Sequence, residues 1–350
     1  MARPKLGTLT IAAAYIGTVV GAGFASGQEV LQFFTFFGLN GILALSLAGV
    51  LFVFFGRAVL RLGNELQAAT YSGIVRHANG PFLGRIVDGI ITFFLFGALT
   101  AMAAGAGAIF AEQFGLPKVW GSAVMITASL ATVLSGFHGV VMAVSFVVPI
   151  LLISVLGLCV ATLLSFPIDL GAVRLWAETA KPVIPFWPLS ALAYVSYNIV
   201  LSICILAPLG ARAADAGAIR RGALWGGFGL FLGALAINLA ILTLPSAAAQ
   251  FEVPMVFIAG RFSPVVKGGY GLVLLAEIYT TAVANLYGFT ARVTPPETKR
   301  FKKIALLTAA VAFAASLLGF STLVRYLYST VGIAGLLLLG GLTYRVWRRK

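Results

Sequence analysis

The sequence predicts an all-α membrane protein with ten transmembrane helices, and three observations support this fold class. Sixty per cent of the 350 residues are hydrophobic, and the mean hydropathy is +1.03, which leaves too little polar surface for a soluble globule. Ten apolar stretches are long enough to cross about 30 Å of hydrocarbon. Most of the 24 Lys and Arg residues fall on alternate connections between these stretches, as the orientation of helices in a bilayer requires.

The apolar stretches follow one another with short connections. They are predicted to span the membrane near residues 7–37, 41–60, 86–112, 118–136, 138–166, 188–209, 220–245, 265–291, 304–319 and 321–344. With a cytoplasmic N-terminus, the outer loops contain only Lys118, Arg174, Lys181, Arg261 and Lys267 as basic residues. Both termini are therefore expected in the cytoplasm. The net charge of +14 is then explained by topology, with the lipid bilayer as partner and no nucleic acid.

The long outer loop at 167–187 divides the predicted helices into two groups of five. Residues 1–166 form the first half and residues 188–350 the second. An odd number of spans in each half gives the halves opposite orientations, which is the arrangement of an inverted repeat.

The first span contains the most informative motif, at residues 15–29. Gly17, Gly21, Gly23 and Gly27 each weaken a helix by about 1 kcal/mol relative to Ala, so the helix is expected to be discontinuous. A break frees backbone groups that lipid cannot satisfy: the N–H groups suit a carboxylate and the carbonyls suit a cation. The alternative is close helix packing, because the GxxxG spacing of these glycines is also a packing motif.

A cation site is predicted where the first and eighth spans meet. By helical rise, Thr18 lies about 17 Å from Gly7, and Thr280 lies about 18 Å from Arg292, so the two threonines have matching depths. Their hydroxyls, beside freed carbonyls, form an oxygen site that suits Na⁺. Alternatively, the threonine hydroxyls bond back to their own helices.

Two acidic residues fall within the predicted spans, Glu29 and Glu277. An ionisable group at such a position is a functional hypothesis by default, and either carboxyl could carry a proton. Glu29 and Arg325 have similar depth, which suggests a thin extracellular gate that pairs them when the site closes. The alternative reading is a permanent structural ion pair or a group that reaches the interface.

The sixth span contains the polar segment YVSYN at 194–198. By its order within the second half, this span is the expected second discontinuous helix. Because the segment lacks glycine, an unbroken helix that presents Tyr194, Tyr197 and Asn198 to a cavity is the alternative.

The motif GTVVGAGFASGQE at 17–29 resembles the opening of the YkvI-type amino-acid permeases of bacteria, and YVSYN at 194–198 and YTTAVAN at 279–285 support the resemblance. That family is placed in the amino acid, polyamine and organocation superfamily, which implies a LeuT-like fold and a bacterial inner (plasma) membrane. It implies a substrate held between spans one and six, with spans three and eight completing the site. Carried over by position, the substrate site would comprise Thr18, Gly21, Ala22, Gly23, Tyr194, Ser196, Tyr197 and Asn198. A sodium site would comprise the carbonyls near Gly17 and Val20 with Thr280 and Thr281.

The sequence thus predicts a secondary active transporter that takes up an amino acid or similar small zwitterion, coupled to Na⁺ or H⁺. No cofactor other than Na⁺ is expected. A membrane enzyme is disfavoured, because His77 and His138 are the only histidines and no nucleophile–base or metal-ligand cluster is recognisable. A passive channel and a ligand-binding sensor without transport are the alternatives.

Overall fold

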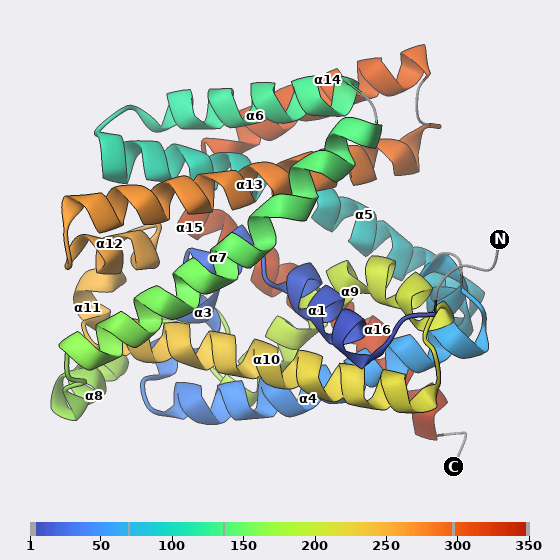
Figure 1. Cartoon of the computed structure of the whole chain (residues 1–350), viewed down its shortest axis with the longest axis horizontal. Helices are drawn as coiled ribbons and strands as arrows, with labels where there is room; N and C mark the ends of the chain where they lie inside the picture. The colour runs from blue at the N-terminus through green and yellow to red at the C-terminus, as the bar shows by residue number, and fades with distance from the viewer. Residues whose placement is uncertain (1–4, 69–70, 136, 296–297, 348–350) are drawn as a thin grey trace.

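The computed structural model describes residues 5–68, 71–135, 137–295 and 298–347, and this part of the chain is folded into helices joined by short loops (Figure 1). The first half contains α1 (Thr8–Val19), α2 (Ala22–Ala25), α3 (Gln28–Phe33), the 3₁₀ turn η1 (Thr35–Phe37), α4 (Asn40–Glu65), α5 (Tyr71–Phe114), α6 (Lys118–Leu134) and α7 (Phe137–Ser165). The remainder contains α8 (Leu170–Thr179), α9 (Trp187–Ala211), α10 (Ala216–Leu242), α11 (Pro245–Ala248), α12 (Pro254–Gly260), α13 (Pro264–Val293), α14 (Lys299–Ser316), α15 (Phe320–Leu323), the π-helical turn η2 (Val324–Tyr328) and α16 (Ser329–Trp347).

Within the described residues, six helices are long and apolar enough to cross a membrane, or up to seven if a bent pair counts as one span. The six are α4, most of α5, α9, α10, α13 and the continuous run from α15 to α16. The bent pair is Ile150–Ser165 with Leu170–Thr179, at 118°. Of the other predicted spans, 7–37 is broken, 118–136 corresponds to the shorter α6, and 304–319 lies on α14. The chain is therefore an all-helical membrane protein, and the count of ten spans stays a prediction.

The first predicted span is discontinuous, as the glycine-rich motif indicates. Helix α1 ends where Val20 and Gly21 adopt extended backbone angles, with ψ of 103° and −172°. A second interruption follows at Gly27, whose φ of +80° is accessible to glycine at little cost. The predicted span thus contains three short helices rather than one long one.

The sixth predicted span is not broken, which corrects the expectation of a second discontinuous helix. Helix α9 runs without interruption over 25 residues, and Tyr194 to Asn198 lie inside it. The physical reason is local: this segment has no glycine to lower the cost of leaving the helix. Its only internal proline, Pro208, lies in the last turn.

The helices pack in two groups, and α16 contacts both of them. α1, α4, α9 and α10 contact one another on one side, while α5, α6, α13 and α14 form the other group. α7 crosses diagonally over α13 and α10, and α16 lies against both α9 and α5 (Figure 1).

Glycines set the closest approach between α4 and α9. A Cβ on Gly210 would strike the Leu60 backbone oxygen, and a Cβ on Gly63 would strike that of Ala207. Because the obstacle in both cases is backbone, this crossing depends on the missing side chains.

Candidate functional site

The break between α1 and α2 is buried and leaves backbone groups free of helical hydrogen bonds. The Val20 amide donates to Ile16 O at 2.8 Å, and the next regular bond runs from the Ala25 amide to Gly21 O at 3.0 Å. The amides at the start of α2 and the carbonyls at the end of α1 therefore lie outside both ladders. However, α2 has only four residues, too few for a substantial helix dipole, which weakens the expected carboxylate site at its N-terminus.

The second interruption of the first span, at Ser26 and Gly27, is held by hydrogen bonds from two other helices. The Tyr270 hydroxyl of α13 donates to Ala25 O at 2.6 Å, and the Met255 amide of α12 donates to Ser26 O at 3.0 Å. The Ser26 hydroxyl in turn donates to Gly23 O at 2.7 Å. This side of the broken helix is thereby fixed against α12 and α13.

The Glu29 side chain lies inside the protein, against the glycine-rich segment. Its exposed fraction is 6%, and the Tyr197 hydroxyl of α9 donates to its Oε2. A Cβ on Gly23 would collide with Glu29 Oε1, so the carboxylate occupies the space that a side chain at position 23 would need. Gly23, Glu29 and Tyr197, predicted separately from sequence, are thus brought together.

The remaining predicted residues of α9 are used differently. Tyr194 packs with Tyr197 at a ring-centroid distance of 5.4 Å, whereas the Asn198 amide donates within the helix to Tyr194 O at 2.9 Å. A Cβ on Gly335 of α16 would lie 2.6 Å from Ser196 Oγ. Ser196 therefore lies on the face that packs against α16, and its role in the substrate site stays a prediction.

The predicted sodium ligands meet only in part. Thr281 faces the break, because a Cβ on Gly21 would lie 3.9 Å from Thr281 Oγ1. By contrast, Thr18 Oγ1 donates to Ala14 O at 2.5 Å and Thr280 Oγ1 donates to Glu277 O at 2.9 Å, so the alternative of bonds back to the same helix holds for both hydroxyls.

Glu277 is the second buried acid, with 3% exposure. The Thr281 side chain lies next to its carboxyl, while Oε2 has no hydrogen-bond partner among the described residues. This carboxyl was not among the predicted sodium ligands. Its spacing of four residues from Thr281 is the sequence signal that places the two side chains on the same face of one helix.

The predicted pairing of Glu29 with Arg325 is not present in this conformation. Arg325 Nη2 donates to Lys181 O at 2.7 Å, and Glu29 binds Tyr197 instead. The ion pairs among the described residues are Arg61–Glu65, Lys118–Glu252 and Arg292–Asp88. Within that part of the chain, neither Glu29 nor Glu277 has a cationic partner.

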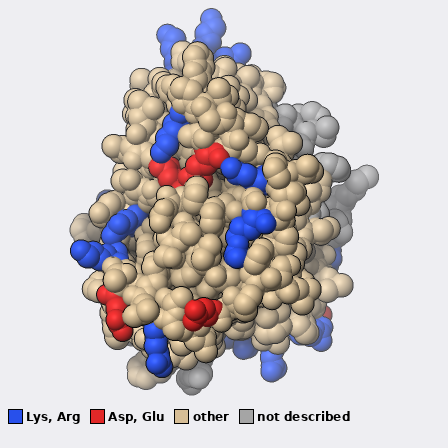
Figure 2. All heavy atoms as spheres, turned by 90° about the vertical axis from the view of Figure 1, so that its left-hand side faces the viewer, with Lys and Arg blue, Asp and Glu red and all other residues tan. Residues whose placement is uncertain are grey.

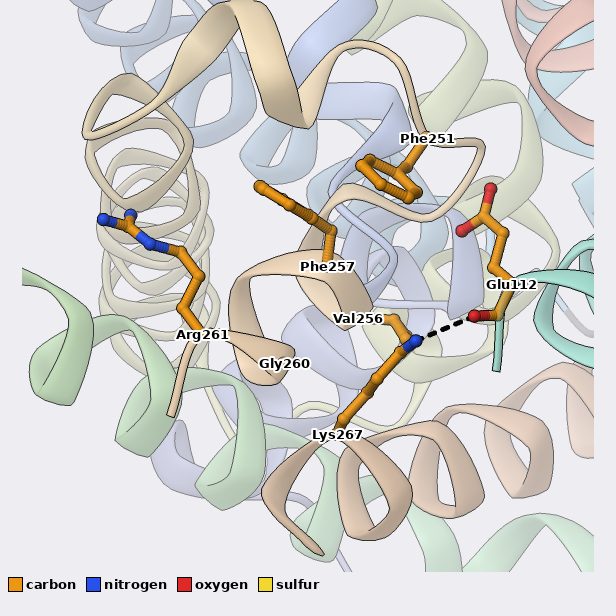
Figure 3. A pocket seen from close by; sticks show the side chains of 7 residues that line it. All are labelled: Glu112, Phe251, Val256, Phe257, Gly260, Arg261 and Lys267. Atoms are coloured by element: carbon orange, nitrogen blue, oxygen red, sulfur yellow. Dashed lines mark hydrogen bonds between the residues drawn. The ribbon is translucent and has the colours of Figure 1, made fainter. Parts of the chain in front are cut away.

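A cavity of about 260 Å³ lies between α12, the end of α5 and the start of α13 (Figure 3). Phe251 and Phe257 stack on one wall with their centroids 4.5 Å apart, and Lys267 Nζ donates to Glu112 O at 2.8 Å. The surrounding face carries both acidic and basic side chains (Figure 2). Glu29 is not among the residues that line this cavity.

At the opposite end, α5 and α13 are held together by a polar cluster. Arg292 Nη2 lies 2.6 Å from Asp88 Oδ1, Arg292 Nε donates to Thr92 Oγ1 at 2.8 Å, and the Tyr71 hydroxyl donates to Asp88 Oδ1 at 2.9 Å. The two ends of the molecule are thus held by different sets of contacts.

Comparisons with known proteins agree with this architecture. No family model matches the sequence. The chain is 31% identical over 342 residues to the membrane protein YkvI of Bacillus subtilis, covering 98% of this chain and 97% of YkvI. It is 28% identical over 330 residues to YyaD of the same organism, covering 93% and 92%.

Solved structures with a similar fold are membrane transporters. The inward-facing conformation of Mhp1 matches with a TM-score of 0.65 and 17% identity, covering 96% of this chain and 77% of that one. MhsT in complex with L-phenylalanine matches with a TM-score of 0.60 and 17% identity, covering 97% and 88%. A Na⁺-coupled sialic acid symporter matches with a TM-score of 0.57 and 12% identity, covering 94% and 76%. These matches show that the chain has the fold of LeuT-like transporters, and the identity to YkvI over nearly the whole chain shows that the protein belongs to the YkvI family.

Proposed function

We propose that this protein is a secondary active transporter that takes up a small zwitterionic solute, such as an amino acid, by alternating access. The observation that carries the proposal is the discontinuous first span, which is buried against α9 and α13 and has Glu29 and Thr281 directed at it. Irregular backbone at membrane depth is tolerated where it lines a site. The shared fold of Mhp1, MhsT and the sialic acid symporter supports the same reading.

The proposed topology has ten spans. Residues 1–166 and 188–350 form inverted halves joined by an extracellular segment at 167–187. Both termini lie in the cytoplasm, and the protein resides in the inner (plasma) membrane of a bacterium. The distribution of basic residues supports this orientation.

The proposed coupling ion is Na⁺, bound where Thr281 approaches the end of α1. The carbonyls of Gly17 and Val20 and the Thr281 hydroxyl supply hard oxygen ligands, which suit this ion. Thr280 joins them only if its hydroxyl turns away from Glu277 O. Coupling to H⁺ through Glu29 or Glu277 is the alternative, since both carboxyls lie in the interior without a described cationic partner.

The proposal is tested by uptake into proteoliposomes of a panel of radiolabelled amino acids, with Na⁺ and pH gradients imposed separately. We expect saturable uptake driven by one gradient. In Thr281→Ala, we expect at least a tenfold loss of Na⁺ activation, equivalent to about 1.4 kcal/mol.

The matched control for this variant is Thr290→Ala. Thr290 is a buried threonine of the same helix, whose hydroxyl donates to Leu286 O at 2.7 Å. Flux that rises linearly with solute concentration would favour a channel, and tight binding without flux would favour a sensor. Sodium dependence that survives in Thr281→Ala would disprove the ion site.

A further inference from the structure

The Glu29 carboxylate accepts a hydrogen bond from a tyrosine that lies within a cluster of aromatic rings. Tyr197, which donates to this carboxylate, has four neighbouring rings with centroids between 5.2 and 5.7 Å from its own, two of them from tyrosines. These rings belong to Phe33, Phe94, Tyr194 and Tyr328. They come from α3, α5, α9 and η2, so four segments converge on the tyrosine that binds this acidic side chain.

A buried carboxylate without a cation is costly, and the described residues supply none. Burial of an ionised group is unfavourable unless an opposite charge is paired with it. None of the three ion pairs among the described residues includes Glu29. The cluster also contains the buried Tyr194 hydroxyl, which makes no hydrogen bond of good geometry among the described residues, although the Asn198 side chain lies near it. Glu29 is therefore suited to a partner that carries positive charge and hydrogen-bond donors.

The chemistry of the walls distinguishes between possible cations. A hard metal ion prefers several oxygen ligands, but the printed side-chain partner of Glu29 is a phenol that packs among aromatic rings. An organic ammonium group matches both parts, because it donates to a carboxylate and is attracted to the faces of aromatic rings. A proton alone would neutralise Glu29 but would leave the Tyr194 hydroxyl without a hydrogen bond of good geometry.

We propose that Glu29 and its tyrosines bind the ammonium group of the transported solute, and that the solute's carboxylate is dispensable. The substrate class is then a small solute with a protonated amine. This inference rests on the proposed transport function and specifies which part of the solute the site recognises. Because the carboxylate lies on the Gly23 backbone, the ammonium group binds directly beside the break in the first span.

The test uses three probes with the same hydrocarbon chain and different charged groups: L-leucine, isoamylamine, which lacks the carboxylate, and 4-methylpentanoate, which lacks the amine. Binding is measured as the thermal shift of purified full-length protein. We expect L-leucine and isoamylamine to stabilise the protein and 4-methylpentanoate to have no effect. If all three are inactive at about 10 mM, equivalent sets built on alanine and phenylalanine are used, and failure of every amine to bind overturns the proposal.

Glu29→Gln keeps the shape of the side chain and an acceptor for Tyr197 but removes the charge. We expect its affinity for the amine to fall at least tenfold, whereas Tyr197→Phe, which keeps the ring, should lose less. Glu178→Gln, at an exposed position on α8, is the control for loss of a negative charge. If Glu29→Gln does not fold, the ranking of the three probes on the wild-type protein still decides the question.

The outcomes separate this inference from the proposed function. Uptake of 4-methylpentanoate that is unaffected in Glu29→Gln would leave transport intact and refute the ammonium site. Amine binding that depends on Glu29 but never produces flux would support the site and refute transport. Unchanged amine affinity in Glu29→Gln would overturn the inference directly.

Discussion

Gly23→Ala is expected to reduce substrate affinity and uptake by about 10- to 100-fold while the protein still folds. The new methyl group would occupy the position of Glu29 Oε1, so the carboxylate must move and its hydrogen bond with Tyr197 is lost. The displaced carboxylate also loses its contact with the solute's ammonium group, and a hydrogen bond to a charged group contributes about 1.5–3 kcal/mol, which corresponds to this range of affinity. Uptake kinetics in proteoliposomes measure the effect.

The control for this variant is Gly89→Ala on α5, where a Cβ meets no atom within 4 Å. Both variants should elute as monodisperse protein in gel filtration. Wild-type uptake by Gly23→Ala would show that the position of the Glu29 carboxylate does not matter for transport. Equal losses in both variants would point to a general effect of alanine in these helices.

The second large effect is expected on stability, from Gly210→Ala. Its methyl group would strike the Leu60 backbone oxygen, and Leu60 C would lie only 2.8 Å away. A backbone atom of a helix cannot avoid the methyl group by a rotamer change, as a side chain could. The two helices α4 and α9 must therefore move apart where they cross. We expect a loss of about 3 kcal/mol, at the upper end of the cost of overpacking, measured as a lower midpoint of thermal unfolding in detergent.

Gly340→Ala is the matched control, because Gly340 lies on the exposed face of α16 and its Cβ would meet nothing within 4 Å. Gly63→Ala should reproduce the effect of Gly210→Ala, since it strikes the Ala207 backbone from the other helix. A melting temperature for Gly210→Ala equal to that of Gly340→Ala would contradict the close crossing of α4 and α9.

The position of the break in the first span was predictable, because its cause is local. Gly21 needs no tertiary partner to lower the cost of leaving the helix, and the structure places the interruption at Val20 and Gly21. The same local rule was set aside for the sixth span, where symmetry suggested a second break despite the lack of glycine. Helix α9 is continuous, so the residue-level signal was the better guide there.

The partners of the site residues were less predictable, because depth along a helix says nothing about the direction of a side chain around it. Thr280 and Thr281 have nearly the same depth, yet one hydroxyl bonds to its own helix and the other faces Gly21. Likewise, Glu29 and Arg325 were matched by depth alone. Rotation about the helix axis directs Glu29 to Tyr197, whereas Arg325 reaches the Lys181 carbonyl.

The sequence by itself determined that this is a helical membrane protein with a discontinuous first span and an acid beside the break. These properties follow from composition, from hydropathy and from the conformational freedom of glycine, which act locally. Only the tertiary structure decided that Glu29 lies against Gly23 and binds Tyr197, whose ring packs with those of Tyr194 and Tyr328, and that Thr281 faces Gly21. The physical reason is that packing sets the rotation and spacing of helices that are distant in sequence. The close approach of Gly210 on α9 to the Leu60 backbone on α4 is an example.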